Sequence, residues 1–194
     1  MIRIYPLIFI LLWSSAFITT KPIVDNSDPF AALAFRFFFV ALGFYLFSFY
    51  LNQSLITNKR KIAESVLSGV LFHGFYLGGV FYSISIGMPV GIAALIVTLQ
   101  PVLTNILSGP ILDEKITIQQ WIGVLLGFTG ASLVLGLDVG SGIPLLGLIA
   151  TIIALLSITI STIWQKKISK NLPLSVSNFY QAFGGCFFQV LIVI

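Results

Sequence analysis

Charged residues are scarce in this chain of 194 residues: they make up 8% of the sequence, whereas 58% is hydrophobic. Soluble globular domains carry about 25% charged residues. The mean hydropathy of +1.07 indicates the same departure from a soluble composition. Intrinsic disorder is excluded as well, because it requires low hydrophobicity and high net charge. The composition therefore predicts an integral membrane protein that crosses the bilayer several times.

Cysteine and histidine are almost absent, with one residue of each. A single cysteine excludes a disulfide framework and a site built from several cysteine ligands. An intramembrane enzyme needs an acid, a base, a nucleophile or metal ligands that converge. His73, Cys186 and predicted spans without any Asp or Glu do not supply such a set. We therefore predict no enzyme, no metal site and no cofactor.

Long apolar runs fill most of the chain. A helix needs about 20 mostly apolar residues to cross a hydrocarbon core of ~30 Å. About seven runs meet this length or nearly do: 4–20, 30–51, 65–86, 91–112, 119–137, 144–164 and 176–194. Alternating polar and apolar segments, which would mark a transmembrane barrel, are absent from the sequence. The predicted fold is an all-α polytopic bundle.

The short links between the runs carry helix-start and turn signals. Asp28-Pro29 is typical of an N-cap followed by a first-turn proline. Thr117 and Gln120 form a capping-box pattern before the fifth run. Arg3, the apolar residues after it and Ser14-Ser15-Ala16 could form a cleavable secretory signal, but the rest of the chain is equally apolar. We therefore interpret it as an uncleaved span.

Basic residues indicate the orientation. If the N-terminus is cytoplasmic, eight of the ten Lys and Arg residues fall on the cytoplasmic side. They are Arg3, Lys59, Arg60, Lys61, Lys115, Lys166, Lys167 and Lys170. The positive-inside rule therefore predicts a cytoplasmic N-terminus. This topology explains the net charge of +4, and no basic patch with base-stacking aromatic residues points to nucleic acid.

A weak internal repeat links the first and sixth runs. Ser15 pairs with Ser161 at a separation of 146 residues, and Pro29 pairs with Pro173 at a separation of 144. Five spans lie in one unit, so the second copy starts in the opposite membrane orientation. Inverted repeats of this kind are common in secondary transporters.

Two sequence signatures carry a resemblance to a known family. The first is Trp13-Ser14-Ser15-Ala16-Phe17 with Pro29 and Arg36. The second runs through Ala93-Ala94-Leu95, Leu99-Gln100-Pro101-Val102, Asp113-Glu114-Lys115-Ile116-Thr117, Gln120-Trp121-Ile122-Gly123, Gly127 and Gly130-Ala131. Over residues 5–135 the chain resembles an EamA-type unit of the drug/metabolite transporter superfamily. The family implies ten helices in two inverted five-helix repeats around a central solute cavity.

Set against that family, the chain divides into 1–137, a first repeat of five helices, and 138–194, two helices of a second repeat. We therefore expect a truncated member or a fragment. The leading hypothesis is a secondary transporter of small metabolites, amino acids or drugs in an inner membrane, working by alternating access. The alternative is a non-functional remnant of such a transporter. Expected partners are the lipid bilayer, a small-molecule solute, a proton as coupling ion, and a second copy in a homodimer.

Polar residues inside the spans are the candidates for a solute cavity. Pro101 near the middle of the fourth span predicts a kink, and Gln100 beside it would line a solute path. A kink with only a structural role is the other interpretation. His73 lies near mid-depth with Tyr76 on its face, which suits a proton relay or a neutral histidine bonded to another helix.

Arg36 is the one charge well inside a span. Facing the cavity it would favour anionic or carboxylate-bearing solutes, and facing outward it would snorkel to the membrane surface. Trp13 in the first span is a candidate wall of the same cavity. Gly123, Gly127 and Ala131 recur at intervals of four, which indicates close helix packing or dimerisation.

Overall fold

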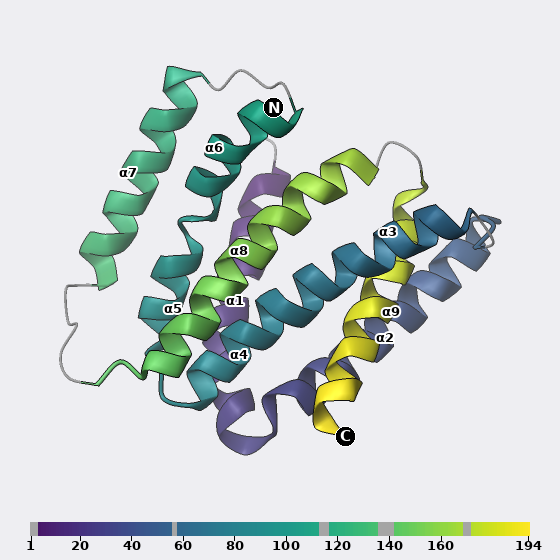
Figure 1. Ribbon diagram of the computed structural model, residues 1–194, viewed down its shortest axis with the longest axis horizontal. Coiled ribbons are helices and arrows are strands. Elements are labelled where there is room, and N and C mark those ends of the chain that lie inside the picture. Colours follow the sequence, from purple (N-terminus) through teal and green to yellow (C-terminus); the bar gives the residue numbers. More distant parts are fainter. Residues whose placement is uncertain (1–3, 56–57, 113–116, 136–141, 169–171) are drawn as a thin grey trace.

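The computed structural model describes residues 4–55, 58–112, 117–135, 142–168 and 172–194. Every regular element in these ranges is a helix (Figure 1), so the all-α prediction is confirmed. In chain order they are α1 (Ile4–Asn26), α2 (Pro29–Tyr50), α3 (Lys59–Gly69), the π-helix η1 (Val70–Tyr76), α4 (Leu77–Ser85), α5 (Val90–Val97), α6 (Gln100–Leu112), α7 (Ile118–Leu135), α8 (Leu145–Ile168) and α9 (Leu174–Val193).

Within the described ranges, six helical stretches are long and apolar enough to cross a membrane. The third span consists of α3, η1 and α4 end to end, and the fourth consists of α5 and α6. The remaining predicted span is occupied by α7, a helix of 18 residues. The predicted all-α polytopic bundle is therefore confirmed, with six helical stretches that meet the requirements of a span and α7 as a seventh helix.

Helix starts follow the signals in the sequence. The Asp28 carboxylate accepts hydrogen bonds from the backbone N–H groups of Phe30 at 2.9 Å and Ala31 at 2.8 Å. Pro29 fits the first helical position because no N–H is needed there. At α7, Thr117 N–H donates to Gln120 Oε1 at 2.8 Å and Gln120 N–H donates to Thr117 Oγ1 at 3.3 Å. Both predicted caps are confirmed.

Two spans that the sequence presents as continuous are irregular. The third contains η1, whose i→i+5 bonding has no simple sequence signature. The fourth breaks at Thr98 and Leu99, where Leu99 N–H bonds the Ile96 carbonyl, three residues back, at 3.1 Å. Pro101 lies in the first turn of α6, just beyond that break. Its ring and missing N–H explain why α5 does not run on into α6.

The third span lies at the centre of the bundle. It packs against α8 on one side and α9 on the other, and α9 runs beside α2 (Figure 1). The helix α1 contacts α2, α4 and α5, whereas α7 lies at the edge of the bundle against α5 and α6. Its position between α1, α2, α8 and α9 makes the third span the element on which the interior depends.

Polar side chains join α3, α8 and α9 inside the bundle. The hydroxyl oxygens of Ser68 and Ser161 lie 3.1 Å apart. Gln165 Nε2 donates to Gln181 Oε1 at 2.8 Å, and Gln181 Nε2 donates to Ser177 Oγ at 3.0 Å. The Ser68–Ser161 and Gln165–Gln181 contacts join different helices, whereas the Gln181–Ser177 bond lies within α9. Interhelical bonds contribute about 0.6 to 2 kcal/mol each in membrane proteins. They fix the register of these three helices.

The α2 cap gives a direct stability prediction. Asp28→Ala removes the acceptor for two backbone N–H groups and should lower the free energy of unfolding by about 1 kcal/mol. Asp25→Ala is the matched control, because Asp25 is exposed and its ion pair among the described residues is with Lys21, within α1. Its loss should cost about 0.3–0.5 kcal/mol. Reversible unfolding by SDS in mixed micelles measures both values, and equal losses would contradict the assigned cap.

Candidate functional site

A cavity of about 220 Å³ lies between α1, α2 and the third span. Its walls are mostly apolar and aromatic, and the polar groups on them are few. Trp13, Arg36, His73 and Tyr76 all line it. The structure therefore brings four of the six cavity candidates from the sequence into one place.

Arg36 contributes the charge of the cavity. Its guanidinium carbon lies 5.6 Å from the centre of the Phe37 ring, which is itself buried. Among the described residues no carboxylate pairs with Arg36; the ion pairs found there join Lys21 to Asp25 and Arg60 to Glu64. A guanidinium offers a planar fork of donors that matches a carboxylate. The cavity thus holds a cation whose natural partner the described part of the chain does not provide.

His73 and Tyr76 enter the cavity from η1. The His73 ring centre lies 4.3 Å from that of Phe37 and 5.0 Å from that of Phe72. Its Nδ1 is buried, and no described residue hydrogen-bonds to it. Tyr76 is 2% exposed. Three or more His, Cys, Asp or Glu side chains do not converge anywhere in the described ranges, so we assign no metal ligands.

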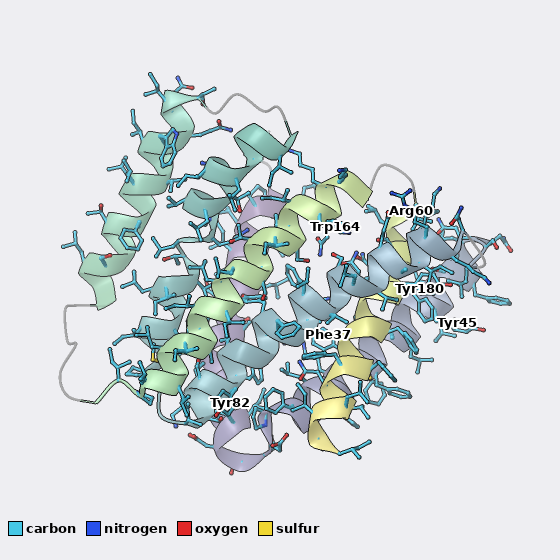
Figure 2. All side chains as sticks on the ribbon, viewed as in Figure 1. Phe37, Tyr45, Arg60, Tyr82, Trp164 and Tyr180 are labelled. Atoms are coloured by element: carbon cyan, nitrogen blue, oxygen red, sulfur yellow. The ribbon has the colours of Figure 1, made fainter. Side chains whose placement is uncertain are left out.

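Aromatic side chains form the parts of the wall that sequence reasoning missed. They are Phe17, Phe37, Phe72 and Phe81. In the view of Figure 2, Phe37 lies toward the middle of the molecule, whereas Tyr45 of α2, Arg60 of α3 and Tyr180 of α9 lie toward its right-hand side. A phenylalanine in an apolar span carries no local signal of what it faces. The sequence offered one clue to the role of Phe37 and Phe72: each is adjacent in the chain to a polar cavity candidate, Arg36 or His73.

Gln100 and Pro101 lie apart from this cavity. Gln100 Nε2 donates to Thr162 Oγ1 at 3.2 Å and to Thr104 Oγ1 at 3.3 Å, so it ties α6 to α8. Pro101 lines a different hollow between α6 and α7, together with Asn105 and Gly123. The break that the sequence predicts is present, but neither residue faces the cavity of Arg36.

The small-residue stripe of α7 is open. A Cβ atom built on Gly123 or Gly127 meets no atom within 4 Å. Neither glycine is therefore in close contact with another helix of the described chain. The side chain of Ala131 lies outside the described residues. A packing or dimerisation role for this stripe stays a prediction.

Comparison with known proteins places the chain among transporters. The family described as the EamA-like transporter family matches residues 3–136. The uncharacterized transporter YvbV of Bacillus subtilis is 28% identical over 106 residues, which cover 55% of this chain and 33% of that protein. The probable amino-acid metabolite efflux pump of Salmonella typhimurium is 24% identical over 172 residues, which cover 86% of this chain and 54% of that protein. The chain spans about half, or less, of the length of these relatives.

The helix α9 packs closely against η1, which carries His73 and Tyr76, and this contact gives a second prediction. A Cβ atom on Gly185 would lie 2.4 Å from His73 Cβ. Gly185→Ala should therefore lower the free energy of unfolding by about 1–3 kcal/mol through overpacking. Gly43→Ala in α2 is the control: open space surrounds Gly43, so helix propensity should raise stability by up to about 1 kcal/mol. SDS unfolding measures the two signs, and a neutral Gly185→Ala would refute the contact.

Proposed function

This chain belongs to the EamA-like transporter family, and on that premise we propose that it takes part in moving small carboxylate-bearing metabolites across an inner membrane. The proposed mechanism is secondary transport by alternating access. The observation that carries the proposal is Arg36, which lines an aromatic cavity and pairs with no described carboxylate. The chain spans about half the length of the efflux-pump relative from Salmonella typhimurium, so transport by the whole protein is part of this proposal.

Arg36 is the proposed recognition group for the solute. An arginine within a span is expensive unless it finds a partner or reaches the membrane surface. A solute carboxylate would supply that partner inside the cavity, through charge-assisted and bidentate hydrogen bonds. The relative from Salmonella typhimurium is named a probable amino-acid metabolite efflux pump. Amino acids contain a carboxylate, which agrees with this choice of solute.

The aromatic walls select the rest of the solute. Ligand sites are mostly apolar, with a few polar groups that fix orientation. Phe17, Phe72 and Phe81 offer an apolar surface to a hydrocarbon side chain, and a cavity of about 220 Å³ admits only a small molecule. The favoured class is therefore a small amino acid or related carboxylate with an apolar side chain.

In this proposal, the third and fourth spans change conformation during transport, because both depart from regular α-helix. Transporters bind solutes near mid-membrane where helices are discontinuous. The third span changes to a π-helix there and the fourth breaks at Thr98 and Leu99. A proton is the proposed coupling ion, with His73 as the residue that would carry it. Assembly as a homodimer is a separate part of the proposal, through the open stripe on α7.

Substituting Arg36 tests the recognition step. Arg36→Gln should raise KM for apolar amino acids, because loss of a charge-assisted hydrogen bond costs about 1.5–3 kcal/mol, roughly ten- to a hundredfold. Arg36→Lys keeps the charge without the planar fork, so its effect should be intermediate. Uptake of radiolabelled L-leucine and other apolar amino acids into proteoliposomes provides the measurement.

The matched ligand control removes only the carboxylate. L-leucinamide should not compete with L-leucine in the unsubstituted protein. Arg60→Gln is the protein control, since Arg60 is an exposed arginine paired with Glu64 near the N-terminal end of α3. No flux of any amino acid in a folded preparation, or equal loss in both arginine variants, would contradict the proposal.

Orientation in the membrane is a further part of the proposal, with the N-terminus in the cytoplasm. In a Cys186→Ser background, Asn26→Cys should react with a membrane-impermeant maleimide added to intact spheroplasts. Lys59→Cys should react only after permeabilisation, because the loop between α2 and α3 is placed inside. The reverse labelling pattern would overturn the assignment.

A further inference from the structure

The π-helix leaves one backbone carbonyl without its usual partner. In an α-helix the Leu77 N–H would donate to the carbonyl four residues earlier, that of His73. Here it bonds the carbonyls of Phe72 and Gly74 instead. Gln189 of α9 takes the vacated place, because its Nε2 donates to His73 O at 2.8 Å and to Gly74 O at 3.3 Å.

Gln189 is held against η1 by its neighbours on α9. Gly185, Phe188 and Gln189 are spaced so that they share one helix face. A Cβ on Gly74 would lie 2.6 Å from the Phe188 ring, and one on Gly78 would lie 3.1 Å from Gln189 Nε2. Glycines on both helices thus let the backbones approach until the amide reaches the carbonyls.

The position of Gln189 is costly for a glutamine. Its side chain is 0% exposed, and its Oε1 is buried without a hydrogen-bond partner in the described structure. An apolar residue of the same shape would remove the unpaired Oε1, but it would leave the His73 carbonyl without a donor, because the Leu77 N–H bonds other carbonyls. The contribution of Gln189 therefore lies in the donor that it offers to η1.

We propose that Gln189 is a positioning residue for the cavity: its amide holds the π-helical register of η1, and that register points His73 and Tyr76 toward Arg36. The π-helix holds one more residue in its turn than an α-helix does. If η1 returned to α-helical bonding, the helix register would shift by one residue, which would rotate the flanking side chains by about 100°. His73 and Tyr76 would then leave the cavity wall. The consequence for transport rests on the proposed function, whereas the effect on cavity geometry does not.

The single histidine makes the test site-specific. Protein labelled with histidine carrying 13C at the carbonyl and 15N in the ring gives NMR signals from residue 73 alone. Gln189→Met keeps the length of the side chain and removes the donor. We expect both the carbonyl and the ring signals of His73 to shift in this variant, in the 194-residue chain reconstituted in lipid nanodiscs.

Gln181→Met is the matched control. Gln181 is also a buried, hydrogen-bonded glutamine of α9, but its partners are Gln165 and Ser177. It should leave both His73 signals in place. Gly78→Ala is the second test should Gln189→Met fail to fold, because the added methyl group displaces the Gln189 amide without removing it. It should shift the carbonyl signal in the same direction by a smaller amount.

Uptake assays then separate the inference from the proposed function. If both hold, Gln189→Met raises KM for L-leucine several-fold with a smaller change in kcat, and Gln181→Met does not. His73 signals that stay unchanged in folded Gln189→Met, or that shift equally in Gln181→Met, overturn the positioning role. Shifted signals without uptake in any variant uphold the positioning role and overturn the proposed function instead.

Discussion

A hydrogen bond from the Gln189 side chain to the backbone of η1 is the interaction on which this structure depends. The hydrocarbon core of a bilayer offers no water to a free carbonyl, so an irregular helix persists there only when the protein satisfies its backbone. The third span departs from α-helical bonding at η1, and Gln189 supplies the donor that this departure requires. Because the third span packs against both α8 and α9, its register also sets the position of the helices around it.

The cavity follows from that register. His73 and Tyr76 reach it from η1, Arg36 reaches it from α2, and Trp13 completes it from α1. Aromatic rings supply much of the remaining wall, and electrostatic interactions beside such apolar groups are stronger than in water. A cation without a carboxylate partner among the described residues, in a largely apolar cavity, favours a solute with one anionic group and an apolar body. The proposed transport of carboxylate-bearing metabolites rests on this match and on family membership.

Features that depend on neighbouring residues were predictable from the sequence. The caps at Asp28 and at Thr117 with Gln120 are local hydrogen bonds, and both form as expected. Pro101 signalled a disrupted fourth span, because proline acts on its own helix. Features that depend on contacts between distant helices were not predictable: η1, the role of Gln189 beneath it, and Gln100 bonded to Thr162 instead of facing the cavity. Arg36 and His73 stood out as polar residues in apolar spans, but only packing decides that they line the same cavity.

Solute binding beside His73 is the central claim, and the ring of that histidine reports on it directly. With 15N in the ring of the single histidine, titration with L-leucine should shift the ring signals saturably. L-leucinamide should not shift them, and neither should L-leucine in the Arg36→Gln variant. Ring signals that do not respond to any apolar amino acid, or that respond equally to the amide, would contradict a carboxylate site in this cavity.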